Sequence, residues 1–179
     1  MRALILGIAL AVAATPAFAE FTVSSPDVKS GSPMRLAQVN TLCKGRNVSP
    51  ALAWSGEPAG TKSFAVTVFD TDARAGKGWW HWAVFDIPAS VHGLPAGAGG
   101  TAATGLPAGA VQGSNDFKTP GYAGPCPPPA DHAHHYEIRV YALKVATLPL
   151  KANTPDAEIA PELSANALTT AKIVGRYGR

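Results

Sequence analysis

The sequence predicts a mainly β protein whose strands are joined by long loops. Charged residues make up only 15% of the 179 residues, whereas the chain holds 18 glycines and 16 prolines. Such a composition favours strands and turns over helices. Three runs, at 63–69, 79–87 and 135–143, are rich in β-branched and aromatic residues and have the length of strands.

Residues 1–19 have the pattern of a cleaved secretory signal peptide. Arg2 supplies a positive charge, residues 3–14 form an apolar run, and residues 17–19 form a small-residue cleavage pattern. This run is too short to span a membrane, and no second long apolar run follows. We therefore expect a single domain over residues 20–179, without an integral membrane segment, that is exported to the periplasm or secreted.

The net charge and the two cysteines limit the partners and the kinds of site that we expect. The net charge is only +3, and Lys and Arg never cluster beyond a pair, which argues against a nucleic-acid partner. Cys43 and Cys126 are the only cysteines, and in an exported protein we expect them to form one disulfide. The alternative is two free buried thiols. Neither cysteine has a Cys or His at metal-ligand spacing, which argues against a zinc site.

The first half of the domain leads up to one central strand. Residues 63–69 are apolar on both faces, which indicates a strand covered on both sides. It ends at Asp70, and a glycine-bearing loop over 71–78 leads into the next strand, so we expect the two strands to pair antiparallel. Three short strands are expected before it, namely residues 21–23, an edge strand at 34–39, and residues 51–54.

The stretch from Gly78 to Asp86 surrounds one histidine with three tryptophans. Side chains alternate across a strand. The expected faces are Trp79, His81, Ala83 and Phe85 on one side, and Trp80, Trp82 and Val84 on the other. An imidazole buried among such groups needs a hydrogen-bond partner, a metal or a ligand. Asp70 and the start of this strand should lie at the same end of a sheet.

Irregular connections and two further elements are expected in the second half. Residues 88–109 and 114–129 show no helical or strand period, and a short strand at 111–113 separates them. The second connection ends in the proline-rich run 124–129, which forms either a stiff pocket wall or a plain structural turn. After the strand at 135–143 we expect a helix over 156–171, capped by Thr154, and a last strand over 173–177.

Four polar side chains are candidates for one site: Asp70, His81, His134 and Tyr136. Alternation along the strand at 135–143 points His134 and Tyr136 inward, with Ile138, Val140 and Ala142. Imidazole N–H and phenol O–H groups donate hydrogen bonds to phosphate or carboxylate oxygens. An aspartate behind a histidine fixes its tautomer and favours the protonated ring. Each residue also has an ordinary structural explanation, and two histidines with an aspartate can instead ligate a metal.

Acyl-transfer chemistry fits the sequence poorly. There is no Gly-x-Ser-x-Gly motif, and neither cysteine has an obvious base beside it.

The chain resembles the phosphatidylethanolamine-binding protein (PEBP) family, also called Raf-kinase-inhibitor-like proteins, in its bacterial exported branch. The resemblance runs over nearly the whole of residues 20–179 and rests on several separate motifs in the right order. They are NVSPALAW at 47–54, PAGTKSF at 58–64, DTDA at 70–73, GWWHW at 78–82, NDF at 115–117, GYAGPCPP at 121–128 and HHY at 134–136.

This resemblance implies an antiparallel β-sandwich with short C-terminal helices and a pocket for small anions at the ends of the sheet. It implies ligand-binding roles for Asp70, for Trp79 as an aromatic wall, for His81, for a wall of Cys126 and Pro128, and for His134 and Tyr136 as donors. The family's first motif usually reads Asp-Pro-Asp-Ala-Pro. Here Thr71 and Arg74 replace the prolines, so a cis-proline geometry is impossible at these positions. Arg74 is expected to lie in solvent, and the alternative is that it adds positive potential near the mouth of the pocket.

The expected function is therefore non-enzymatic binding of phosphate, a phospholipid head group or a similar anion. No cofactor and no metal are expected. A protein partner stays unknown, although some members of the resembled family dock onto a protease or a kinase. One alternative is a metal-dependent or acid–base hydrolase that uses the same histidines and aspartate. Another is an interaction module whose pocket is vestigial.

Overall fold

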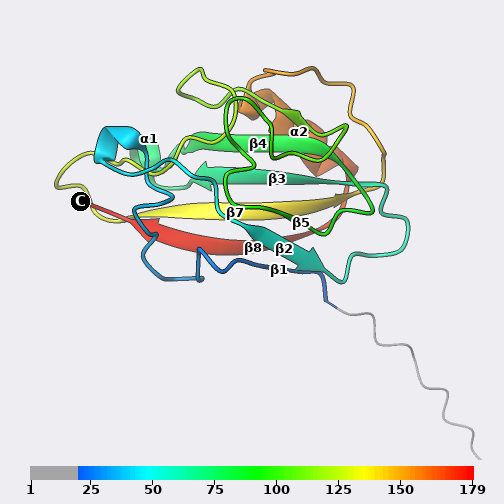
Figure 1. The fold of residues 1–179 in the computed structure, drawn as a ribbon, viewed down its shortest axis with the longest axis horizontal. Helices are drawn as coiled ribbons and strands as arrows, with labels where there is room; N and C mark the ends of the chain where they lie inside the picture. The colour runs from blue at the N-terminus through cyan, green and yellow to red at the C-terminus, as the bar shows by residue number, and fades with distance from the viewer. Residues whose placement is uncertain (1–19) are drawn as a thin grey trace, which may run out of the picture.

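The structure is a computed structural model that describes residues 20–179; the predicted signal peptide lies outside the described residues. Two antiparallel sheets form the domain, in the strand orders β1-β2-β5 and β6-β4-β3-β7-β8. The smaller sheet covers one face of the larger sheet, and helix α2 (Asp156–Asn166) covers the other (Figure 1). The predicted mainly β sandwich is confirmed, although a single helix takes the place of the expected C-terminal helices.

The strands differ greatly in length. The larger sheet holds β3 (Ser63–Asp70), β4 (Trp79–Pro88), β6 (Val111–Gln112), β7 (His134–Leu143) and β8 (Ala167–Tyr177). The smaller sheet holds β1 (Thr22–Ser24), β2 (Leu52–Ser55) and β5 (Gly93–Leu94). Two single-turn elements complete the described chain, η1 (Thr41–Cys43) and α1 (Ala73–Gly76).

Strand β3 lies at the centre of the larger sheet, as its doubly apolar pattern predicted. It pairs antiparallel with β4 on one side and with β7 on the other. Val66 and Val68 pack in the core between the sheets, whereas Ala65 packs in a second cluster that includes Ile159 and Leu163 of α2. β3 is therefore covered on both faces, and β4 and β7 flank Asp70 at its end.

A β-bulge in β4 breaks the alternation that the sequence predicted. Val68 pairs with Trp82, and the next residue, Phe69, pairs with Trp80, so His81 is the extra residue. Bulges change the direction of side chains and are frequent beside functional sites. The expected face of Trp79, His81, Ala83 and Phe85 is therefore wrong: Ala83 and Phe85 pack toward α2, while Trp79 and His81 line a cavity with residues of β3 and β7.

Two further predictions, for residues 34–39 and 88–109, are also corrected. Residues 34–39 do not form an edge strand, because a turn closes between Arg35 and Gln38. The carbonyls of Leu36, Ala37 and Val39 accept hydrogen bonds from the backbone of residues 46–48 instead. The connection over residues 88–109 is not wholly irregular, since β5 lies within it and pairs with β2.

The boundary between α2 and β8 lies earlier than predicted. The helix ends at Asn166, and the residues from Ala167 onward already pair with β7. Thr154 is not the N-cap, because its hydroxyl donates to the carbonyl of Lys151 and Pro155 takes the cap position. The predicted last strand at 173–177 is present as the second half of this longer β8.

The expected disulfide joins Cys43 to Cys126, with the two Cα atoms 5.6 Å apart. It ties the proline-rich run to η1, and the N–H of Asn40 adds a hydrogen bond to the carbonyl of Pro125. In the described range 20–179, no helix has the length and apolar character needed to cross a membrane.

Candidate functional site

The site is built where β3 ends, β4 begins and β7 begins. Asp70 pairs with Trp79 of β4 on one side and with Tyr136 of β7 on the other. Three neighbouring strands therefore deliver three candidate residues in one row across the sheet. This confirms that Asp70 and the start of the tryptophan-rich strand lie at the same end of the sheet.

A cavity of about 310 Å³ opens at this end of the sheet. Its volume is at the lower limit of ordinary small-molecule sites. All of the residues expected from the sequence line it, namely Asp70, Trp79, His81, Cys126, Pro128, His134 and Tyr136. The structure thus brings the whole set together, and their contact with a ligand stays a prediction.

Two buried donors in the cavity wall lack partners within the described residues. They are the hydroxyl of Tyr136, whose side chain is completely buried, and the indole N–H of Trp79. Burial, the negative charge of Asp70 and a contact of the hydroxyl with the Asp70 carboxylate, which falls short of hydrogen-bond geometry, together raise the pKa of Tyr136 far above its usual value, so the phenol keeps its proton. An unpaired buried donor costs roughly 1–3 kcal/mol, which an acceptor supplied by a ligand would offset.

His81 is held in one orientation by the backbone of the proline-rich loop. Its Nδ1 lies 2.5 Å from the carbonyl oxygen of Ala123, which can only accept, so Nδ1 carries the proton. Its Nε2 is 4.0 Å from the carboxylate of Asp70, too far for a hydrogen bond. Burial lowers the pKa of His81 despite these oxygens, so the ring is neutral and presents the lone pair of Nε2.

His134 lies between two carboxylates. Its Nδ1 is 2.7 Å from Asp70 and its Nε2 is 3.2 Å from Asp131. Carboxylates only accept, so both contacts are hydrogen bonds only when the ring is protonated. Burial opposes that charge, but the hydrogen bonds to Asp70 and Asp131 outweigh it and raise the pKa of His134. The two carboxylates therefore favour a positively charged His134 in the wall, although neither ring nitrogen of the charged form is a free donor.

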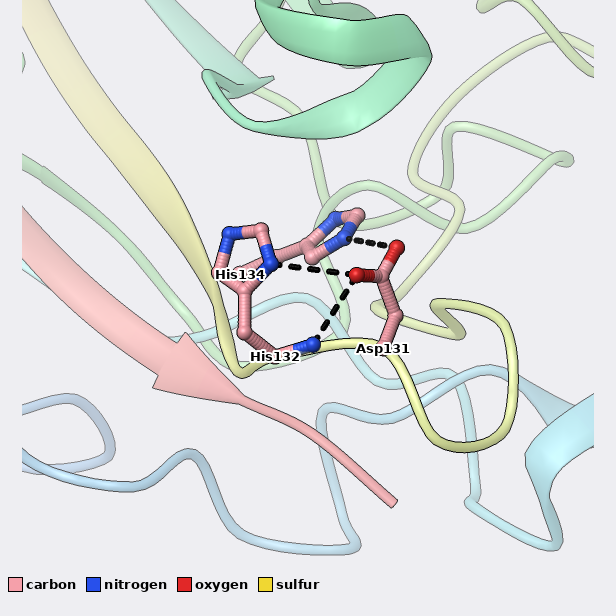
Figure 2. A group of neighbouring side chains, drawn as sticks. All are labelled: Asp131, His132 and His134. Atoms are coloured by element: carbon pink, nitrogen blue, oxygen red, sulfur yellow. Dashed lines mark hydrogen bonds and ion pairs between the residues drawn. The ribbon is translucent and has the colours of Figure 1, made fainter.

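The contacts continue into a chain of alternating carboxylates and imidazoles. Figure 2 shows that Asp131 also contacts the ring of His132, whose Nδ1 is the atom involved. This contact is 3.0 Å long, and Nε2 of His132 lies 3.4 Å from Asp72. Asp72 in turn accepts from the backbone and the ring of His135. Partial burial of Asp72 opposes its ionisation, but the hydrogen bonds from His135 and His132 lower its pKa to about 2.

A left-handed turn at α1 forms the mouth of the cavity. Arg74 and Ala75 have φ of 54° and 56°, and the guanidinium of Arg74 lies 4.9 Å from the centre of the Trp79 ring. Proline is restricted to φ near −65°, so the backbone found at Arg74 is one that the family's usual proline could not adopt. Arg74 is exposed, as expected, but it also lines the cavity and stacks on its aromatic wall.

Sequence reasoning did not assign two other wall residues. Phe117 packs edge-on against the rings of Trp79 and His81, and Asp131 holds the outer nitrogen of His134. Phe117 belongs to the NDF motif that carried part of the resemblance, so that motif was a signal for it. Asp131 sits in a run of polar residues, and only the folded chain shows which of them faces the cavity.

Comparisons with known proteins agree with this fold and site. The sequence model described as "Phosphatidylethanolamine-binding protein" matches residues 24–178. The protein YbcL of Escherichia coli is 46% identical over 180 residues, which cover 99% of this chain and 98% of YbcL. A crystal structure of E. coli YbcL, titled as a new member of the mammalian PEBP family, superimposes with a TM-score of 0.87 and 48% identity, over 90% of this chain and 99% of that one.

More distant relatives extend the comparison. A putative PEBP homologue from Chlamydia trachomatis has a TM-score of 0.72 at 28% identity and covers 89% of this chain and 97% of its own. A putative lipoprotein of Mycobacterium tuberculosis, LppC, is 36% identical over 90% of this chain and 74% of its own length. This lipoprotein relative and the disulfide together suggest an exported protein.

None of these relatives is described as a hydrolase, so the comparisons give that alternative no support. The family match covers most of the chain, and YbcL aligns with nearly all of it. On these grounds, the chain belongs to the phosphatidylethanolamine-binding protein family.

Proposed function

We propose that this protein binds a small anion, either free phosphate or the phosphate of a phospholipid head group, in the cavity between β3, β4 and β7. It acts as a binding protein and does not convert its ligand. The proposed location is the periplasm or the exterior of the cell. The proposal includes a partner protein that recognises either the occupied or the empty form of the cavity.

The observation that carries the proposal is the pair of unpartnered donors. Tyr136 and Trp79 each bury an O–H or N–H group in the wall of one cavity. An indole nitrogen only donates, and the phenol keeps its proton, so both groups need an acceptor. A phosphate offers several acceptor oxygens, and one ion would satisfy both groups at once.

Two basic groups face the cavity. The carboxylates of Asp70 and Asp131 favour the protonated form of His134, and Arg74 stands at the mouth over Trp79, so the positive charges of the wall balance its two carboxylates. The negative charge of Asp70 is offset by His134 and by the backbone N–H groups of Asp72 and Ala73. His81 can donate to an anion only after Nε2 takes up a proton, so binding would favour the protonated ring.

The side chains that line the cavity argue against covalent catalysis. Among the described residues that line the cavity there is no serine, threonine or lysine, and Cys126 is part of the disulfide. Hydroxyl nucleophiles of serine and threonine, the lysine amine and a free thiol are therefore missing from this wall.

NMR titration of the purified chain with inorganic phosphate and with phosphorylethanolamine tests the proposal. We expect the indole N–H resonance of Trp79 to shift and saturate. The indole of Trp54, which is also buried and unpartnered but lies in the core between the sheets, should stay in place. Sodium chloride at matched ionic strength is the control. A Trp79 resonance that does not move, or moves equally with chloride, contradicts the proposal, as does release of phosphate from a generic monoester.

A further inference from the structure

We propose a second ligand site at the rim of the cavity, where Asp131, His132 and His134 bind a divalent first-row transition metal such as Zn²⁺ or Cu²⁺. No metal was expected from the sequence, and the metal alternative weighed there involved Asp70, His81 and His134 instead. The proposal rests on the arrangement of the rim residues alone and does not require that an anion binds in the cavity.

The three side chains converge on one point (Figure 2). Each offers one ligand atom, and the three atoms lie within 4.8 Å of one another. Oδ1 of Asp131 is 3.0 Å from Nδ1 of His132, and the other oxygen of the same carboxylate, Oδ2, is 3.2 Å from Nε2 of His134. Ligands at about 2.0–2.1 Å from a tetrahedral zinc are separated by roughly 3.3 Å, so these pairs already have the spacing of neighbouring ligands.

The far nitrogen of each histidine is turned toward a second carboxylate. Nδ1 of His134 lies 2.7 Å from Asp70, and Nε2 of His132 lies 3.4 Å from Asp72. Histidines that bind metals usually donate their other N–H to a carboxylate, which fixes the tautomer and the orientation of the ring. Two aspartates of the same turn after β3 therefore orient both rings with their inner nitrogens toward Asp131.

The ligand types and their exposure suit an exchangeable ion. A set of two imidazoles and one carboxylate suits zinc and copper, whereas calcium and magnesium prefer oxygen ligands alone. The side chains of His132 and Asp131 are 65% and 41% exposed, so an ion can reach them from solvent, whereas His134 is only 3% exposed and offers its Nε2 from the buried side of the site. Three protein ligands leave further positions open to water or to an oxygen of a ligand in the cavity.

Calorimetric titration of the untagged chain with Zn²⁺, after removal of metals by chelation, tests this site. We expect saturable binding of one ion per chain. His132→Gln and Asp131→Asn should each weaken the affinity about tenfold or more, since each removes one of three ligands. His92→Gln is the matched control, because His92 is also exposed and pairs with a carboxylate, that of Glu57, 2.8 Å away, without a third ligand.

Two results overturn the proposal: no saturable binding of Zn²⁺, or binding that His132→Gln leaves unchanged. His132 does not line the anion cavity, so a phosphate titration of metal-free His132→Gln measures the anion site separately.

Discussion

Nδ1 of His134 lies 2.7 Å from Oδ2 of Asp70, and both side chains are almost fully buried. The other oxygen of Asp70 accepts from the backbone N–H groups of Asp72 and Ala73. One carboxylate therefore fixes the histidine of β7 and the turn that forms the mouth of the cavity. The geometry of the site depends on this pair more than on the outer contact of His134 with Asp131.

Asp70→Asn should accordingly destabilise the fold by roughly 3 kcal/mol at pH 6, because it leaves a buried imidazolium without its countercharge. Asp131→Asn removes the other carboxylate partner of the same ring, but that carboxylate is exposed, so the cost should be much smaller than that of Asp70→Asn. Urea denaturation of the two variants measures both values. Equal costs would contradict the dominant role of Asp70.

Gly78→Ala tests how β4 enters the site. Gly78 has a φ of 83°, and a Cβ there would lie 1.9 Å from the ring of Phe69. Gly76 also has a φ of 83° but open space around it, so Gly76→Ala should cost only about 1 kcal/mol of backbone strain. Gly78→Ala should cost roughly 1–3 kcal/mol more from overpacking. In a Phe69→Ala background this excess should vanish, and its persistence would refute the steric explanation.

Asp156 should make stability depend on pH. It is buried at the start of α2, neither carboxyl oxygen has a partner in the described chain, and burial, with the charge of Asp116, raises its pKa to about 8. The unfolded value is about 3.9. Between these values the native state keeps a proton that the unfolded state loses, so the free energy of unfolding falls as pH rises toward 8.

The slope from Asp156 should approach about 1.4 kcal/mol per pH unit between about pH 5 and 7. Asp156→Asn should remove that part of the slope, whereas Glu158→Gln, one exposed residue of the same turn, should retain it. Denaturation curves at several pH values measure the difference. An unchanged slope in Asp156→Asn would show that this carboxyl does not titrate in the manner described.

The disulfide should contribute strongly to stability. Cys43 and Cys126 are separated by 83 residues, and closing a loop of that size stabilises a fold by roughly 2–4 kcal/mol. The double variant Cys43→Ala/Cys126→Ala should lose about this amount and bind phosphate more weakly, since Cys126 belongs to the cavity wall. Mass measurement of the unreduced, alkylated chain should show no added alkyl groups, and two would disprove the bridge.

The strands that build the site could be predicted because their patterns are unambiguous. Residues 63–69 are apolar on both faces, which only a central strand satisfies, and the alternation from His134 to Ala142 defines one buried face. β3 ends and β7 begins with polar residues next to a loop, and antiparallel pairing brings these two strand ends together. This is why Asp70, His134 and Tyr136 could be assigned to one site before any coordinates.

Other features depend on relationships that a single strand does not reveal. The bulge at His81 exists only relative to β3, so alternation alone wrongly grouped His81 with Ala83 and Phe85 on one face. The residues around Ala167 have no glycine or proline to stop a helix, and pairing with β7 decides that they form a strand. The position of Arg74 over Trp79 could not be predicted, because the left-handed backbone that turns it there leaves no mark in the sequence.

The affinity of Tyr136→Phe for inorganic phosphate, compared with that of Tyr141→Phe, is the most direct measurement. Both residues lie on β7, but Tyr141 packs on the α2 side of the sheet. Loss of the buried Tyr136 hydroxyl should weaken phosphate binding at least about tenfold and raise the free energy of unfolding by about 1 kcal/mol, because an unpaired donor is removed. Tyr141→Phe should bind phosphate as the unmodified chain does. Equal phosphate affinity in Tyr136→Phe and the unmodified chain would contradict an anion held by the donors of this cavity.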